Sequence, residues 1–330
     1  MKKIFYAMTL MTLAASSAFA QTPAPAPTPT AMPQTAATPA SLETILSEAE
    51  KQKINYQETF KDLLATETKT FEEYDKDGEI DRETVVESNF LVYQSSKDKE
   101  VSSELRNITK INGKLVPDSQ ARADKFLAEL QKSKTLEKEL EKIQDEGVRY
   151  DKTIDIINFT IFEGVTLAER IRPNFEFKLL GTEDYNGSRV YVVSYQQTKK
   201  SPLIVIDEKE PKNEDVAVYY DIKLPGALKK NEKFLQGKLW IDAATFQLWR
   251  EERRVAVQQT NGAPLIIQET VFEYNLSEFG ILVPKKIVFL DNSVKKNSGN
   301  FGTAKDTKVT FDYSKFRKTN VEVLISDDEN

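Results

Sequence analysis

The chain has 330 residues, of which 39% are hydrophobic and 30% are charged, and its formal net charge is -6. This acidic balance argues against a nucleic-acid partner, because neutralising phosphates requires clustered Lys and Arg. The sequence contains no cysteine and no histidine. That composition excludes disulfides, thiolate catalysis and a lipid-modified cysteine, and it removes the commonest general base and metal ligand.

The N-terminus has the form of a secretory signal peptide. Lys2 and Lys3 precede a short apolar run, Ile4–Leu13, and Ala18-Phe19-Ala20 is a small-x-small cleavage site. The apolar run is well short of the ~20 residues that span a membrane. We therefore predict a signal peptide over residues 1–20 that is cleaved after Ala20, export to the periplasm as a protein that is not a lipoprotein, and no transmembrane span in the mature chain.

A change of composition separates this signal from the folded part. Residues 21–40 are rich in Pro, Thr and Ala and lack charged and aromatic residues, which predicts a disordered, extended linker. The folded part begins at Ser41. Apolar residues at positions 42, 45, 46 and 49 predict an amphipathic helix over Ser41–Glu50, with Ser41 as its N-cap.

Three strands are predicted next. Tyr56–Tyr74 and Glu79–Gln94 are joined by the turn residues Asp75–Gly78, and Val101–Ile111 ends at the turn Asn112-Gly113. Asp75 and Asp77 also suggest a calcium loop, but the spacing of the ligands is wrong and no flanking helices are evident. We therefore predict no metal site.

Two helices are predicted in the middle of the chain. Ser119–Glu146 keeps near-helical apolar spacing and ends before Gly147, a suitable terminator. Phe159–Arg170 is apolar on nearly every side, which predicts a short helix buried against a sheet.

The remaining chain is predicted to be mainly strands, with an acidic, irregular surface insertion at Glu208–Leu224 and a long loop at Asp291–Asp306. Short links such as Asp242–Thr245 and Asn261-Gly262 predict an antiparallel meander. Strands and helices do not alternate, which argues against a parallel sheet. The predicted strands are Phe175–Thr182, Ser188–Gln197, Ser201–Ile206, Leu235–Ile241, Phe246–Val257, Leu265–Leu276, Ile281–Leu290 and Thr307–Phe316.

Both faces of this sheet are expected to be covered, because Trp240 and Trp249 lie opposite the aliphatic side of their own strands. The cover is either an ordinary solid core or a lid over an apolar cavity. The charged run Glu251–Arg254 is predicted to form solvated cross-strand pairs. No catalytic motif is present, so we predict a protein that is not an enzyme and has no cofactor; a hydrolase with an unrecognised carboxylate site is a further alternative.

Three segments carry a resemblance to a known family. Gly237–Phe246 (Gly-Lys-Leu-Trp-Ile-Asp-Ala-Ala-Thr-Phe), the strand Glu269–Tyr274 and the step Gly280–Pro284 resemble the LolA-like family of outer-membrane lipoprotein-sorting proteins. The resemblance implies an α+β fold that is mainly β: an unclosed antiparallel β-barrel with a helical lid. It implies a single half-barrel domain over residues 41–317, followed by a polar tail at 318–330.

The resemblance also implies a function. We expect a periplasmic lipid- or lipoprotein-binding carrier with an apolar cavity between curved sheet and lid, acting as a monomer, with lipid acyl chains or a lipidated envelope protein as partner. The alternative is a non-enzymatic cell-envelope interaction or stress-sensor protein with a solid core. The candidate residues lining the cavity are aromatic: Phe159, Phe162, Trp240, Phe272 and Tyr274.

Overall fold

The computed structural model describes residues 40–61, 63–94, 102–119, 121, 145, 147–149, 160, 163–207, 216, 218–260, 262–297 and 300–318. The predicted signal peptide, its cleavage site and nearly all of the linker lie outside these residues, as do most of the helix Ser119–Glu146 and the polar tail. Those predictions therefore stay predictions.

Most of the described chain is β-sheet. The strands of the large sheet are β1 (Leu63–Tyr74), β2 (Ile80–Gln94), β3 (Ser102–Ile111), β4 (Lys114–Leu115), β5 (Phe175–Tyr185), β6 (Ser188–Gln197), β9 (Lys233–Asp242), β10 (Leu248–Val257), β11 (Leu265–Leu276), β12 (Leu282–Asn297) and β13 (Asn300–Lys318).

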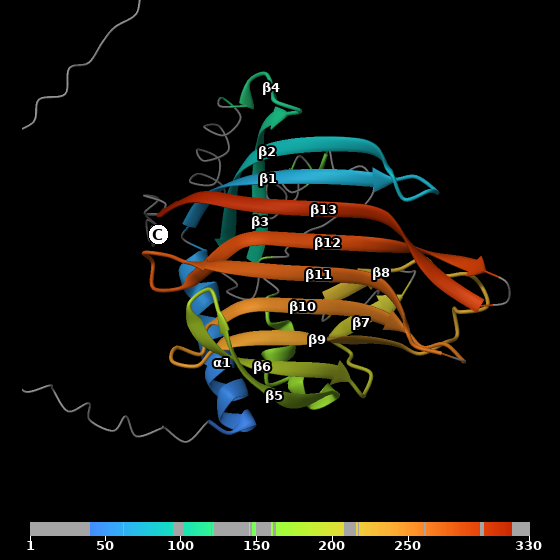
Figure 1. The fold of residues 1–330 in the computed structure, drawn as a ribbon. Helices are drawn as coiled ribbons and strands as arrows, with labels where there is room; N and C mark the ends of the chain where they lie inside the picture. Colours follow the sequence, from blue (N-terminus) through green and yellow to red (C-terminus); the bar gives the residue numbers. More distant parts are fainter. Residues whose placement is uncertain are drawn as a thin grey trace, which may run out of the picture. The chain divides into compact units, whose positions relative to one another are not determined.

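These strands form one 11-stranded sheet in the order β4-β3-β2-β1-β13-β12-β11-β10-β9-β6-β5 (Figure 1). Every neighbouring pair is antiparallel, and β4 and β5 do not pair with each other, so the sheet is not closed. The predicted meander is confirmed as β9 to β13, and the predicted open antiparallel sheet is confirmed with it.

Two predictions about loops are wrong. The predicted loop Asp291–Asp306 is instead the extended arm of the hairpin β12–β13, which pairs from Asn292↔Lys305 to Asn297↔Asn300. Most of its residues are polar and half-buried or exposed, so no apolar alternation indicated a strand.

The predicted insertion Glu208–Leu224 also contains structure. Its end forms β8 (Val218–Asp221), which pairs in parallel with β7 (Ile204–Asp207) as a separate two-stranded sheet. Tyr220, Ile222 and Leu224 are buried. Alternate residues therefore face the core, a period of two that the acidic composition of the segment concealed.

The first helix is longer than predicted. α1 runs over Leu42–Phe60, and the backbone N–H of Thr44 donates to Ser41 Oγ at 3.2 Å, which confirms Ser41 as the N-cap. The prediction of a strand from Tyr56 is wrong, because Tyr56 and Phe60 complete the helix. Their rings stack at 4.9 Å, a contact that the four-residue spacing of a helix provides.

The predicted helix Phe159–Arg170 is not an α-helix in the part that is described. Gly164 has φ 50, in the left-handed region, and only a 3-10 turn, η1 (Val165–Leu167), follows it. A second 3-10 turn, η2 (Arg172–Asn174), leads into β5. Within the described residues, the predicted helical lid is therefore the single α-helix α1.

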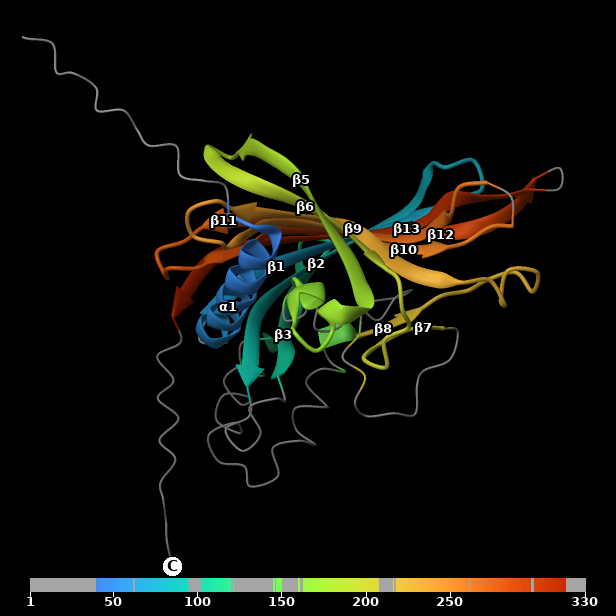
Figure 2. The ribbon, with the colours of Figure 1, turned by 90° about the horizontal axis from the view of Figure 1, so that it is seen from below.

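We call the face of the sheet that α1 covers the inner face (Figure 2). The strand registers define it by a continuous row of paired residues, and alternate residues on each strand make up the outer face. The row across the inner face is Lys69, Phe311, Ile287, Phe272, Glu251, Leu239 and Val193.

Candidate functional site

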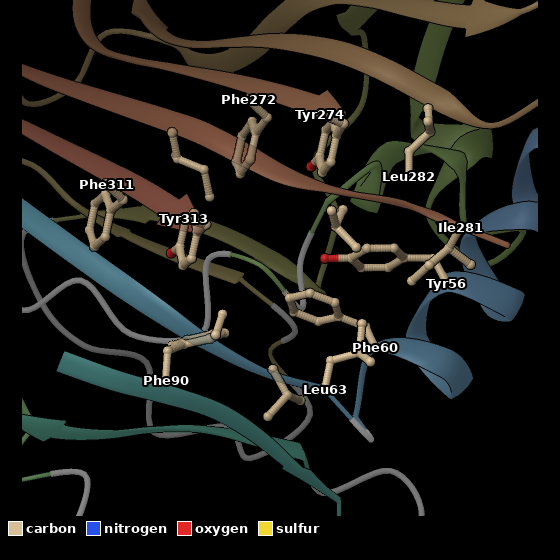
Figure 3. Packing of buried hydrophobic residues seen from close by; sticks show 14 of the residues in the cluster. Tyr56, Phe60, Leu63, Phe90, Phe272, Tyr274, Ile281, Leu282, Phe311 and Tyr313 are labelled. Carbon is tan, nitrogen blue, oxygen red and sulfur yellow. The ribbon is translucent and has the colours of Figure 1, made fainter. Parts of the chain in front are cut away.

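An aromatic cluster lies where the C-terminal end of α1 meets the inner face (Figure 3). The ring centroid of Phe60 lies 6.2 Å from that of Phe90 on β2 and 6.1 Å from that of Phe316 on β13. Tyr56 meets Tyr274 of β11 edge-on at 6.4 Å. The last turn of one helix thus covers rings from several strands, and this cover is apolar.

Three of the candidate cavity residues, Trp240, Phe272 and Tyr274, belong to one buried core cluster. Phe272 and Tyr274 are two positions apart on β11, and both are fully buried. Phe272 lies on the inner face, and Tyr274 lies on the same side nearer α1. Trp240 lies on the outer face, where its indole N–H donates to Glu183 Oε1 at 2.6 Å. Phe159 and Phe162 lie outside the described residues.

Charged residues are buried on the same inner face. Arg106 on β3 donates to both oxygens of Glu67 on β1, at 2.7 and 2.9 Å, and to Glu104 at 2.8 Å. Burial alone would raise the pKa of the Glu67 carboxyl, but the Arg106 guanidinium and Lys69 hold that pKa below its ordinary value. This cluster is therefore ionic.

A second buried ion pair lies on β10. Arg253 donates to both oxygens of Glu251 at 2.9 Å, and the Tyr195 hydroxyl donates to Glu251 Oε1 at 3.1 Å. Solvated pairing was predicted for this run, and for these two residues it is wrong, since Glu251 is 0% and Arg253 3% exposed. The period of two turns this pair inward and leaves Glu252 and Arg254 on the outer face.

Gly237 gives Tyr195 the room it needs. The two residues are paired across β6 and β9, and a Cβ at position 237 would lie 2.6 Å from the Tyr195 hydroxyl. An aromatic ring packed over a strand glycine compensates for its missing side chain. Gly237, the glycine of the predicted hairpin motif, therefore leaves space for the Tyr195 hydroxyl, which donates to the buried Glu251 carboxylate.

The two buried carboxylates hold one short segment of chain. Thr160 donates through its N–H and its hydroxyl to Glu104 Oε1, at 2.6 and 2.7 Å. The N–H of Gly164 donates to Glu251 Oε2 at 2.8 Å. The Tyr56 hydroxyl of α1 donates to the carbonyl oxygen of Thr160 at 3.2 Å. Thr160 and Gly164 thus connect β3, β10 and α1.

This tethering implies a curved sheet. β3 and β10 are six strand spacings apart, about 29 Å in a flat sheet at ~4.8 Å each. The five residues from Thr160 to Gly164, which are four Cα–Cα steps, span at most about 14 Å. The inner faces of β3 and β10 must therefore turn toward each other, as in a half-barrel.

A small hollow lies between α1, the start of η1 and β12. Its volume is about 20 Å³, which is room for about one water molecule. Polar and apolar side chains share its lining, which consists of Ala49, Gln52, Lys53, Tyr56, Glu163, Gly164, Leu167, Gln247, Leu248, Ile281 and Leu282.

Two ionisable groups at this hollow have shifted pKa values. Burial raises the pKa of the Glu163 carboxyl to about 8, and the nearby Tyr274 hydroxyl and Lys53 oppose that rise only in part. Burial also lowers the pKa of Lys53, although the acidic groups around it act in the other direction. Among the described residues the Lys53 ammonium makes no hydrogen bond or ion pair.

The inner face also carries buried hydroxyl groups. Among the described residues the Ser88 hydroxyl has no hydrogen-bond partner, although buried hydroxyls are ordinarily hydrogen-bonded. The Tyr274 hydroxyl lies beside the Glu163 carboxyl and the Tyr313 hydroxyl beside the Glu67 carboxyl, and each acts to lower the pKa of that carboxyl.

The outer face carries a different hollow. It measures about 260 Å³ and crosses β5, β6, β9 and β10. Its side chains are mainly charged or amidic, including Glu176, Lys178, Lys238 and Arg254, so it does not suit an acyl chain. Among the described residues, no group of three or more acidic side chains is placed to hold a metal ion.

Comparisons with known proteins give likenesses of structure. No family model matches the sequence, and no curated protein matches it. A candidate outer membrane lipoprotein-sorting protein domain from Vibrio parahaemolyticus is 12% identical with a TM-score of 0.34, covering 83% of this chain and 95% of that one. A LolA superfamily protein from Nitrosomonas europaea is 11% identical with a TM-score of 0.34, covering 86% and 95%.

A DUF1329 family protein from Desulfovibrio piger is 9% identical with a TM-score of 0.30, covering 84% of this chain and 93% of that one. The chain is thus similar to solved structures of the LolA superfamily, as the sequence resemblance predicts. Within the described residues, no helix has the length and apolar character needed to cross a membrane.

Proposed function

We propose that this protein is a non-enzymatic carrier in the periplasm, which binds the acyl chain of a lipid or of a lipidated protein between the inner face of its sheet and α1. The observation that carries the proposal is the aromatic cluster. Rings from β2, β11 and β13 meet Tyr56 and Phe60 of one helix, not a second sheet.

The burial free energies allow an acyl chain to replace Tyr56 and Phe60 on the sheet. Burying one aromatic side chain contributes about 1.5–3 kcal/mol, so lifting Tyr56 and Phe60 off the sheet costs roughly 3–6 kcal/mol. Each buried methylene group of an acyl chain contributes about 0.8 kcal/mol. Roughly four to eight methylene groups therefore offset the displacement of these two side chains.

The proposal requires α1 to move. The hollow beside it is about 20 Å³, far below the roughly 300–1,000 Å³ of a typical ligand pocket. The same tight packing favours the alternative, an envelope interaction or sensor protein with a solid core, if α1 does not move.

Fluorescence quenching tests the two alternatives. The native tryptophans, Trp240 and Trp249, belong to the same buried core cluster as Tyr56 and Phe60, so each variant is compared with wild type. Phe60→Trp places a third tryptophan at the end of α1, and Phe316→Trp places one on the neighbouring strand. A brominated stearate should quench the emission of both variants more strongly than that of wild type.

The converse result contradicts the carrier proposal. If the added tryptophans are not quenched although near-ultraviolet circular dichroism shows native packing, the core is solid. Mass spectrometry of lipid extracted from protein purified from a bacterial periplasm provides an independent test, because a carrier should co-purify with acyl-chain lipids.

A further inference from the structure

The hollow beside α1 combines an ammonium group with a partly apolar rim. Lys53 and Glu163 border it on one side, and Leu248, Ile281 and Leu282 border it on the other. Tyr56 lies on its edge and also stacks on Phe60. Tyr56 therefore borders both the hollow and the aromatic cluster.

The acids near Lys53 are engaged elsewhere or uncharged. Glu50 binds Arg172 at 2.5 Å, and Glu251 is held by Arg253, Tyr195 and the N–H of Gly164. The Glu163 carboxyl, with its pKa of about 8, is largely protonated at neutral pH. Lys53 thus borders the hollow as a cation that no described carboxylate contacts.

Lys53 is half-buried, and burial already disfavours its charged form; an anion bound beside it would stabilise that charge. Building on the proposed function, we propose that the hollow receives the carboxylate end of a long-chain fatty acid, with Lys53 as its counterion and the Glu163 carboxyl group as a second hydrogen-bond donor. The acyl chain then runs past Tyr56 onto the aromatic cluster.

The lining of the hollow suits the end of an acyl chain that bears one carboxylate group. A space of about 20 Å³ accepts one carboxylate oxygen, and small shifts of the α1 side chains admit the second. Lys53 supplies one positive charge to balance the single negative charge of that carboxylate.

The charge of the site changes with pH. As the pH rises through about 8, Glu163 ionises, stops donating a hydrogen bond and repels the bound carboxylate. The affinity for the fatty acid should fall over this range. The other charged and titratable groups that act on Lys53 or Glu163 are Glu50, Arg170, Glu251, Arg253 and Tyr274.

The test compares cis-parinaric acid, a fluorescent fatty acid, with its methyl ester, using the full mature chain at pH 7. Wild type should bind the acid about tenfold or more tightly than the ester, because a charge-assisted hydrogen bond is lost in the ester. Lys53→Met should remove this preference, and Lys53→Arg should keep most of it. Lys51→Met, on the exposed side of α1, is the matched control and should change nothing.

The outcomes separate the inference from the function on which it rests. If wild type binds neither compound, the proposed function fails. If it binds both equally, or if Lys53→Met weakens both by the same factor, an acyl carrier is supported but the carboxylate site is overturned. Loss of the acid preference between pH 7 and pH 9 in wild type, and its persistence in Glu163→Gln, would support the role of Glu163.

Discussion

Replacing Glu163 by Gln should make the stability of this protein less dependent on pH. The Glu163 carboxyl is 4% exposed, and burial raises its pKa from 4.5 to about 8. Gln has the same shape and keeps a hydrogen-bond donor, but it cannot ionise. The difference between wild type and Glu163→Gln therefore measures how ionisation of this buried carboxyl changes the free energy of unfolding.

The sign follows from proton binding. Between pH 4.5 and about 8 the folded state keeps the Glu163 proton and the unfolded state has lost it, so the free energy of unfolding falls as the pH rises. Each pH unit in this range is worth about 1.4 kcal/mol. From pH 6 to pH 8 the decline, allowing for titration near pH 8, is about 2 kcal/mol in wild type, and this part of the decline should be absent in Glu163→Gln.

Urea denaturation followed by tryptophan fluorescence at pH 6, 7 and 8 measures this difference. The range begins at pH 6 because burial raises the pKa of Asp291 to about 6, which causes a similar decline at lower pH. The lowered pKa of Lys53 acts in the opposite sense, and only above its own folded-state pKa. Equal slopes for wild type and Glu163→Gln would refute the reasoning, since Glu163 would then be ionised and paired with Lys53 in the folded protein.

Three further substitutions test the fold and the site. Arg106→Met leaves buried carboxylates unpaired and should lower the unfolding free energy by about 3–5 kcal/mol in denaturant titration, whereas Lys110→Met, which removes a half-exposed pair, should cost under about 1 kcal/mol. Gly237→Ala puts a Cβ 1.9 Å from a backbone carbonyl oxygen of β10 and should cost on the order of 2–4 kcal/mol. Gly226→Ala, with nothing within 4 Å, should unfold within about 0.5 kcal/mol of wild type. Trp240→Phe should lose about 1 kcal/mol with its hydrogen bond and leave the affinity for cis-parinaric acid unchanged; an altered affinity would place the acyl site on the other face.

The strands of the sheet could be predicted because local signals mark them. Turn pairs such as Asn112-Gly113 and Asn186-Gly187 adopt the positive φ angles that such turns require, and the apolar alternation of β9 to β11 survives in the structure. The predicted helix ended too early because Tyr56 and Phe60 have strand propensity. In the structure, contacts with the sheet override that propensity.

The candidate site could be predicted only in part. Apolar alternation indicated that Phe272 and Tyr274 face a core, and both are buried; that they and Trp240 line a cavity stays a prediction. Lys53 was missed because the predicted helix ended at Glu50, so the spacing that places Lys53 on the same helical face as Ala49 and Tyr56 was not applied. Glu163 was missed because a charged residue in a loop has no periodicity that distinguishes a buried position from an exposed one.

The buried ion pairs explain why this inner face is not simply apolar. Replacing such pairs by apolar residues is often neutral or stabilising, so their presence calls for another reason. Glu104 and Glu251 each accept from a backbone N–H, at Thr160 and Gly164, and Thr160 in turn accepts from Tyr56 of α1. Apolar side chains could cover the sheet but could not bind backbone N–H groups. Arg106 and Arg253 thus pair with the Glu104 and Glu251 carboxylates inside the fold, and those carboxylates bind the chain that contacts Tyr56 of α1.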